Sequence, residues 1–284
     1  MNFRVLPAEL HPAAEQVARF LKEDRGLSRL KIEEPVEDEL EYRPTFRAVT
    51  PEHYEVWIEI NDDPYLSSLD NIVLFCVQNC IPVKLYVGFR AGLSATEYKN
   101  KVDESRKKGV GAIEVAGEKC TVIHEAVLLS LAGVRLEERT KFPVRYRSNL
   151  STAEATFKNG DPAKGCSLVY DEIEALSRRL TRKVVDKGWL RGGLAWPNLN
   201  IEKAAWANVM ETLIDRIDLT QLPPSLKKHM LIRVSGLTEI RNESGHKPKS
   251  RVDRMRRDRE LRTRFESAVD LLRDFIDATR SLRL

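Results

Sequence analysis

The sequence predicts an α+β protein with two domains, an α/β domain over residues 1–145 and an all-helical domain over residues 160–284. The chain of 284 residues exceeds the usual size of one domain, and 42% hydrophobic with 32% charged residues is typical of a globular protein. Period-two β patterns occur in the first half, whereas helical apolar spacing runs through the second. Turn-forming residues are dense between 143 and 165, which predicts a boundary there.

The N-terminal domain is predicted to begin with an amphipathic helix over 8–22, followed by three β-rich segments. Those segments are expected near 29–34, 42–49 and 54–61. The last alternates between apolar and polar residues, as a half-buried strand does. Alternating helices and strands are expected afterwards: an apolar helix at 66–80, a strand at 83–89, a charged helix at 95–108 capped by Ser94 or Thr96, strands at 110–116 and 121–126, and a short helix at 127–131.

This order of a helix, three strands, a helix, a strand, a helix and a strand resembles the restriction-endonuclease-like fold, over about residues 8–130. In active members of that family, a Pro-Asp pair and a Glu-x-Lys triplet lie on neighbouring strands and hold magnesium. The position that matches the Pro-Asp pair is Pro44-Thr45, so threonine stands where the family has its aspartate. The resemblance therefore implies a retained fold with an altered metal site.

The position that matches the Glu-x-Lys triplet is Glu59-Ile60-Asn61, so the family's lysine is replaced by asparagine. Lys84, on the following strand, would be a relocated lysine. A single carboxylate is a poor magnesium site, because the ion takes several hard oxygen ligands. We therefore expect a degenerate, non-catalytic site made of Glu59, Asn61 and Lys84. The alternative is a divergent, magnesium-dependent DNA nuclease that works through Glu59.

Positive charge belongs to the C-terminal half of the chain. Residues 1–150 contain 21 Lys and Arg against 24 Asp and Glu, and residues 151–284 contain 26 against 19. A positive field favours polyanions such as nucleic acids, although surface lysines and arginines also serve simply to keep a protein in solution. A nucleic-acid partner is therefore expected for the second half.

Other features of the sequence bear on the cellular compartment of the protein and on whether it binds a metal or cofactor. No apolar run approaches the ~18–20 residues of a membrane span, and the start of the chain lacks the apolar stretch of a secretion signal. Four cysteines in a chain of this length do not form a disulfide framework. Cys76 and Cys80 lie one helical turn apart without nearby metal ligands, so buried thiols are expected. A cytoplasmic protein without a metal or cofactor, and without membrane contact, is predicted.

Four helices are predicted in the C-terminal domain, from apolar residues that recur every three or four positions. They are expected at 163–187, 201–217, 225–242 and 251–282, with short connections between them. Four antiparallel helices with short connections form a bundle.

Arg241, Asn242 and His246 lie together between the third and fourth predicted helices. An imidazole can move a proton near pH 7, and a guanidinium can hold a phosphate through two parallel hydrogen bonds. These groups together can cut RNA without a metal ion. The alternative for His246 is a helix cap, where a cation is favoured by the helix dipole.

An all-helical bundle of this size with Arg-Asn-x-x-x-His at the end of its third helix resembles the HEPN superfamily, over about residues 160–284. The resemblance implies a metal-independent endoribonuclease, with Arg241, Asn242 and His246 as catalytic residues. It implies a toxin or an anti-phage abortive-infection effector, with RNA as substrate and an antitoxin or phage-derived trigger as partner. It also implies a homodimer in which two copies of the motif form one composite site.

The segment Tyr170-Asp171-Glu172-Ile173-Glu174 is similar to the acidic residues on an early helix of that family. The resemblance gives Glu172 and Glu174 a supporting role at the site. Alternatively, they pair with nearby arginines such as Arg178.

A basic stretch follows the motif, with ten Lys and Arg against four acids between residues 241 and 264. Such a stretch favours contacts with phosphates. The residues nearest the motif are expected to bind RNA, namely Lys247, Lys249, Arg251 and Arg254. The alternative is that the arginines from 254 onward pair with Asp258 and Glu260 on a solvated face.

A further alternative for the whole protein is a non-catalytic regulatory role, in which the helical domain only dimerises or binds nucleic acid.

Overall fold

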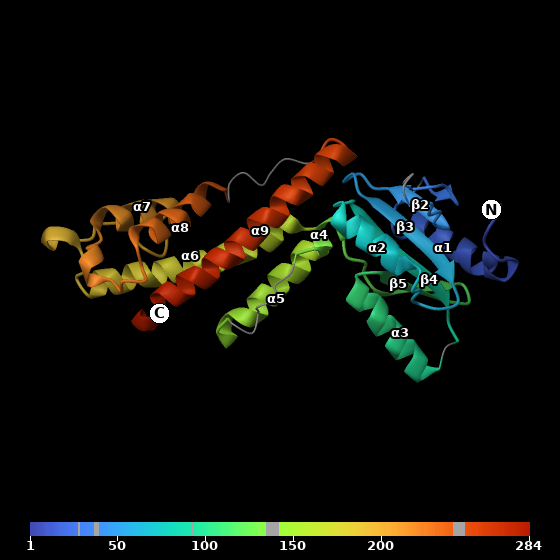
Figure 1. Ribbon diagram of the computed structural model, residues 1–284, viewed down its shortest axis with the longest axis horizontal. Helices are drawn as coiled ribbons and strands as arrows, with labels where there is room; N and C mark the ends of the chain where they lie inside the picture. The colour runs from blue at the N-terminus through green and yellow to red at the C-terminus, as the bar shows by residue number, and fades with distance from the viewer. Residues whose placement is uncertain (28, 37–39, 93, 135–141, 241–247) are drawn as a thin grey trace. The chain divides into compact units, whose positions relative to one another are not determined.

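The computed structural model describes residues 1–27, 29–36, 40–92, 94–134, 142–240 and 248–284, and its chain divides into two compact units (Figure 1). The first, which we call the sheet unit, consists of Met1–Arg135, Lys158–Pro162 and Lys247–Arg262. The second, the helical unit, consists of Leu136–Phe157, Ala163–His246 and Thr263–Leu284. The sequence predicted contiguous domains over 1–145 and 160–284, whereas the compact units interleave along the chain.

The described strands of the sheet unit form one six-stranded mixed sheet with the order β1-β2-β3-β4-β5-β6. The pairs β3–β4 and β4–β5 are parallel, and the other neighbouring pairs are antiparallel. The strands are β1 (Lys31–Ile32), β2 (Phe46–Val49), β3 (Glu55–Asn61), β4 (Val83–Arg90), β5 (Gly111–Ala116) and β6 (Lys119–His124). The mixed α+β class predicted from the sequence is confirmed, as is the order of helices and strands in this unit.

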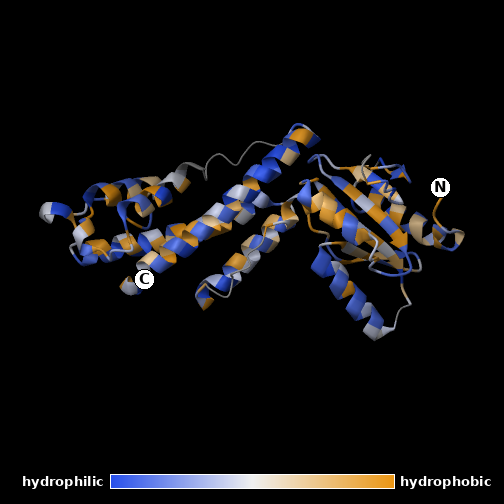
Figure 2. Ribbon diagram, viewed as in Figure 1, coloured by the Kyte–Doolittle hydropathy of each residue, from blue (hydrophilic) through white to orange (hydrophobic). Residues whose placement is uncertain are grey.

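Helices cover both faces of the sheet, because successive side chains of a strand point to opposite sides. On one face, Val56, Ile58 and Ile60 pack with helix α1 (His11–Glu23), which follows the short η1 (Ala8–Leu10). On the other face, Trp57 packs with α2 (Leu69–Gln78). Figure 2 shows the hydrophobic colours concentrated on these strands. The remaining helices of the unit are α3 (Ala95–Lys108) and α4 (Leu129–Ala132).

Two local features explain how α1 and α3 are held. Gly88 on β4 lets α1 approach closely, since a Cβ there would lie 2.7 Å from Ile60 and 3.1 Å from Val17. The predicted cap of α3 is confirmed, because the Ser94 side chain accepts a hydrogen bond from the Glu97 amide. Gly109, with φ of 78°, ends the same helix in the left-handed conformation.

The helical unit is built from segments of the predicted helices and from one helix that was not predicted. Its elements are α5 (Val144–Lys158), α6 (Pro162–Asp186), η3 (Arg191–Gly193), α7 (Trp206–Arg216), η4 (Leu219–Gln221), α8 (Lys228–Ile240), α9 (Arg251–Thr279) and η6 (Arg280–Leu282). The last residue of α5, the first residue of α6 and residues 251–262 of α9 belong to the sheet unit. None of the described helices combines the length and the apolar character needed to cross a membrane.

The segment between 143 and 165 is not the turn-rich linker that was predicted, because most of it is helix α5, although the two units do divide within it, at Lys158 and after Pro162. Four of its side chains recur every three or four residues and are buried: Tyr146, Leu150, Ala153 and Phe157. The Phe157 ring packs on Phe265 of α9, with ring centroids 4.5 Å apart. Burial of this apolar stripe stabilises the helix more than its polar residues disfavour it.

Candidate functional site

The predicted catalytic residues Arg241, Asn242 and His246 lie outside the described residues, as does Lys247. Along the chain they follow α8, which ends at Ile240, and precede α9, which begins at Arg251. The motif therefore lies between α8 and α9 along the chain, and its geometry stays a prediction.

The acidic residues predicted to support this motif already bind neighbours on α5 and α6. Glu172 accepts a hydrogen bond from Asn149. Glu174 accepts two from Arg178, at 2.9 and 2.5 Å, and Arg178 also donates to the carbonyl oxygens of Ile201 and Ala204. The pairing of Glu174 with Arg178 is the alternative that the sequence left open, and it fixes the segment before α7 against α6.

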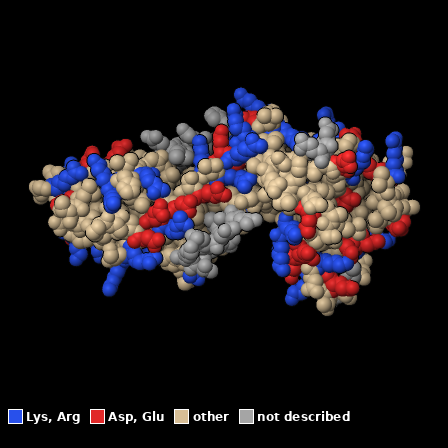
Figure 3. Space-filling model, in the orientation of Figure 1, with Lys and Arg blue, Asp and Glu red and all other residues tan. Residues whose placement is uncertain are grey.

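The first half of α9 is rich in arginine, and Figure 3 shows Lys and Arg side chains prominent there. Arg254 nevertheless faces inward, with only 8% of its side chain exposed. Its Nε lies 2.9 Å from the Asp258 carboxylate, which is fully buried and also accepts a hydrogen bond from Ser130. Burial raises the pKa of Asp258, while Arg254 acts in the opposite direction. In this structure Arg254 is not placed where a polynucleotide can reach it.

Other arginines of the same helix contact the end of α2. Arg259 donates to the Asn79 carbonyl oxygen at 3.3 Å, and Arg262 donates to that of Val77 at 3.5 Å and to the Cys80 sulfur at 3.0 Å. Cations at a helix C-terminus are stabilised by the exposed carbonyl groups and the helix dipole. The predicted alternative was pairing on a solvated face. It describes these residues only in part, because Arg259 and Arg262 also bond to the end of α2 within the sheet unit.

Of the remaining residues predicted to bind RNA, Lys249 is exposed and Arg251 is partly exposed. Arg251 lies 3.6 Å from Glu55, a buried carboxylate at the start of β3. Glu55 also receives two hydrogen bonds from Arg47, at 2.9 and 2.8 Å, and one from the Trp57 indole at 2.6 Å. Lys249 is thus the described residue of this group with the most accessible side chain.

Glu59 lies on the α2 face of the sheet and is partly buried. The Tyr42 hydroxyl donates a hydrogen bond to its carboxylate at 3.0 Å. Burial raises the pKa of Glu59 to about 7, and the hydrogen bond from Tyr42 counteracts only part of that effect. Near neutral pH this carboxyl group is therefore partly protonated.

The residues around Glu59 do not fit a magnesium ion. The Asn61 side-chain oxygen accepts hydrogen bonds from the amides of Asp62 and Asp63, at 2.7 and 3.3 Å. The two aspartates are paired with Arg90 and Lys101. No cluster of three or more His, Cys, Asp or Glu side chains with metal-binding geometry occurs in the part of the chain that the structure describes. One half-protonated carboxylate cannot replace the several hard oxygen ligands that magnesium takes.

The structure does not bring Lys84 together with Glu59 and Asn61. In the parallel pairing of β3 with β4, Lys84 lies opposite Val56, and Glu59 lies opposite Val87. Lys84 and Glu59 therefore point to opposite faces of the sheet. Lys84 is on the α1 face, where it lines a pocket.

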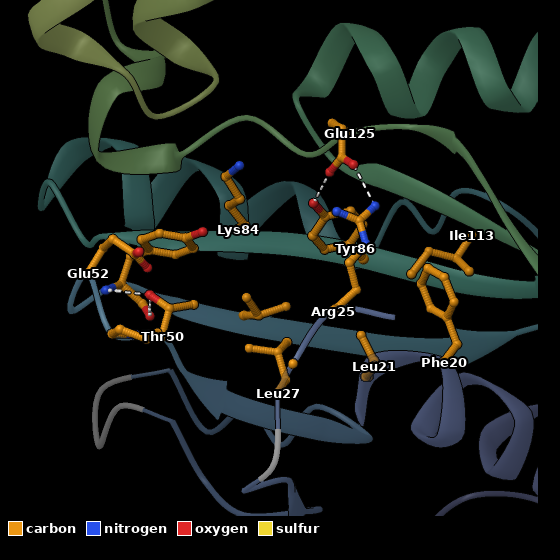
Figure 4. A pocket seen from close by; sticks show the side chains of 14 residues that line it. Phe20, Leu21, Arg25, Leu27, Thr50, Glu52, Lys84, Tyr86, Ile113 and Glu125 are labelled. Atoms are coloured by element: carbon orange, nitrogen blue, oxygen red, sulfur yellow. Dashed lines mark hydrogen bonds and ion pairs between the residues drawn. The ribbon is translucent and has the colours of Figure 1, made fainter. Parts of the chain in front are cut away.

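This pocket lies between the end of α1 and the strands β3, β4 and β5, and it has a volume of about 340 Å³ (Figure 4). In the view of Figure 4, Lys84, Thr50 and Glu52 lie towards one end, and Phe20, Leu21 and Ile113 lie towards the other. Between them, Arg25 pairs with Glu125 at 2.5 Å, and the Tyr86 hydroxyl donates to the same carboxylate at 2.5 Å. The remaining lining residues are Gly26, Leu27, Pro51, Tyr54 and Val56.

The charged groups of the pocket differ in whether they have a hydrogen-bond or ion-pair partner. Burial alone raises the pKa of Glu125, but the hydrogen bonds from Tyr86 and Arg25 outweigh it, and the pKa is lowered. Burial lowers the pKa of the Lys84 ammonium, and Glu125 counteracts only part of that effect. Lys84 Nζ lies 5.6 Å from the centre of the Tyr54 ring, whereas it makes no ion pair or hydrogen bond with any other described residue.

Sequence reasoning missed Arg25, Tyr86 and Glu125 as pocket residues. One signal was present, because Lys84 and Tyr86 interrupt an otherwise apolar strand on the same face. The position of Arg25 depends on the end of α1, where the Leu27 amide bonds to the Leu21 carbonyl oxygen at 2.9 Å.

No family model, curated protein or solved structure matches this chain.

Proposed function

We propose that this protein is a metal-independent endoribonuclease of HEPN type that uses Arg241, Asn242 and His246. The observation that carries the proposal is this set of a guanidinium, an amide and an imidazole within six residues, between two helices and at the start of the basic stretch. The sheet unit supports the proposal indirectly, since Glu59 and its neighbours do not fit a magnesium ion and so offer no competing metal-dependent site. By analogy with the family, the biological role is that of a toxin or an anti-phage effector.

The proposed reaction uses the 2′-hydroxyl that RNA carries beside each phosphodiester. One imidazole removes the proton of this hydroxyl, the 2′ oxygen bonds to the adjacent phosphorus, and the bond to the 5′ oxygen breaks. The leaving 5′ oxygen takes up a proton, so the products are a 2′,3′-cyclic phosphate and a 5′-hydroxyl. DNA lacks the nucleophile and is not cut.

Each motif residue has a role in this reaction. His246 moves the proton, because its unperturbed pKa of ~6.5 lies close to neutral pH. Arg241 holds the phosphate and stabilises the charge that develops in the transition state. Asn242 orients His246 or binds a phosphate oxygen, and Lys249 contributes to RNA binding as an exposed cation. Two copies of the motif from a homodimer form the composite site.

Incubation of the full chain with total RNA in the presence of EDTA tests the proposal. We expect RNA fragments with cyclic phosphate and 5′-hydroxyl ends, and a loss of about a hundredfold or more in His246→Ala and Arg241→Ala. Matched double-stranded and single-stranded DNA should remain intact. Cleavage that EDTA abolishes contradicts the proposal and favours a magnesium-dependent nuclease that works through Glu59. If expression of the chain arrests growth and both variants arrest it equally, the proposal is also contradicted and a regulatory role is favoured.

A further inference from the structure

The pocket on the α1 face of the sheet offers one cation without an acceptor and an apolar cavity next to it. Arg25 and Tyr86 both donate to Glu125, so the charges of Arg25 and Glu125 are paired within the protein. Lys84 differs, because its half-buried ammonium has no hydrogen-bond or ion-pair partner among the described residues. A buried or half-buried charge without a partner is costly, and a ligand that supplies one removes part of that cost.

The rest of the pocket sets the shape and polarity of that ligand. Leu21, Val56 and Ile113 form an apolar floor from α1, β3 and β5. The volume of about 340 Å³ lies at the small end of the range for sites that bind small molecules, roughly 300–1,000 Å³. Tyr54 forms a wall beside Lys84 and offers an aromatic face.

The neighbouring charges leave Lys84 as the cation available to a ligand. Burial lowers the pKa of its ammonium most, Glu125 raises this pKa, and Arg25 and Arg254 lower it. Arg254 Cζ lies 5.9 Å from the centre of the same Tyr54 ring that Lys84 approaches. Since Arg25 pairs with Glu125 and Arg254 pairs with Asp258, a ligand carboxylate or phosphate would pair with Lys84.

We propose that this pocket binds a small organic anion, whose carboxylate or phosphate head group pairs with Lys84 and whose apolar body fills the space beside Leu21, Val56 and Ile113. This site is separate from the residues of the proposed ribonuclease reaction. It gives the sheet unit a ligand-binding role on the face opposite to Glu59. The inference stands whether or not the motif at 241–246 cuts RNA.

Four matched probes test the site on the 284-residue chain by titration calorimetry: phenyl phosphate, phenylacetate, benzyl alcohol and benzylamine. The two anions should bind more tightly than the neutral alcohol, and the cationic amine should bind least. The comparison of phenyl phosphate with phenylacetate distinguishes a phosphate from a carboxylate ligand. Equal binding of the alcohol and the anions, or no binding of either anion, overturns the proposal.

The variant Lys84→Met keeps the apolar stem of the side chain and removes its charge. We expect it to weaken binding of the preferred anion by about tenfold to a hundredfold, as for loss of one charge-assisted hydrogen bond, and to leave the alcohol unaffected. The control Lys107→Met removes an exposed lysine on α3 and should change nothing. Leu27→Trp, which narrows the pocket from its partly exposed side, should weaken all probes. If Lys84→Met and Leu27→Trp bind the anions as the unmodified chain does, the site is elsewhere.

Discussion

The ion pairs of this molecule differ in burial, from buried carboxylates near α9 in the sheet unit to an exposed pair in the helical unit. In the sheet unit, the carboxylates of Glu55 and Asp258 are buried, and each has an arginine within 3 Å. In the helical unit, Arg233 and Asp274 meet at 3.3 Å with 47% and 39% of their side chains exposed. A buried pair depends on both partners, whereas water and salt screen an exposed pair. The basic stretch of α9 therefore has a structural role in the sheet unit, which its sequence alone does not distinguish from nucleic-acid binding.

Removal of the buried Asp258 carboxylate should lower the free energy of unfolding more than any of the other predicted changes. Asp258→Ala leaves Arg254 as a buried charge without its partner and removes the acceptor of the Ser130 hydroxyl. We expect a loss of about 3–5 kcal/mol in the free energy of unfolding, measured by urea denaturation. The control is Asp253→Ala, which removes the partner of the exposed Arg256 on the same helix. A loss below about 1 kcal/mol for Asp258→Ala means that the buried pair does not anchor α9.

A second test uses the pH dependence caused by Glu59. Its folded pKa of about 7 lies above the unfolded value of about 4.5, so the fold favours the protonated form. Its contribution to stability is therefore fully present below about pH 4.5 and is lost as the pH rises through 7. Since one pKa unit corresponds to about 1.4 kcal/mol, the loss is on the order of 3 kcal/mol.

Glu59→Gln removes this titration and keeps a side chain of similar shape. The unfolding free energies of the two proteins should diverge between pH 5 and pH 8, with the variant relatively more stable at the higher pH. A difference that does not depend on pH would show that Glu59 is not held in a buried, protonated state.

The smallest effect is expected for the exposed pair of the helical unit. Asp274→Ala should change the free energy of unfolding by about 0.5 kcal/mol or less, because the pair with Arg233 is solvated. High salt should make the unmodified protein and the variant indistinguishable. A loss comparable to that of Asp258→Ala would remove the distinction between the buried pair and the exposed pair.

Much of the fold could be predicted because local patterns decide it. The alternation of residues 54–61 predicted β3, which spans Glu55–Asn61, and the Ser94 cap predicted the start of α3. Helix α5 was missed because its polar residues resemble a linker, and its stabilising partner Phe265 lies far along the chain. The helix expected from 201 begins at Trp206, because Asn200 holds the preceding residues in a turn through the amides of Glu202 and Lys203.

The candidate sites were harder to predict than the fold, because they depend on contacts between residues that lie far apart in the sequence. The sequence placed Glu59 and Asn61 on one face, but the face of Lys84 depends on the register between β3 and β4, which no local pattern determines. The inward orientation of Arg254 depends on Ser130 and on its pair with Asp258, and the contacts of Arg262 depend on the end of α2. These partners are remote in sequence, so the basic stretch indicated only its charge.

The rate of RNA cleavage by three proteins, measured both in magnesium and in EDTA, tests the central claim that the chemistry belongs to the motif at 241–246 and not to the sheet. The proteins are the unmodified chain, Glu59→Gln and His246→Ala, each with its fold verified by circular dichroism. We predict equal rates for the first two and a loss of about a hundredfold or more for His246→Ala. Loss of activity in Glu59→Gln with full activity in His246→Ala would contradict the account.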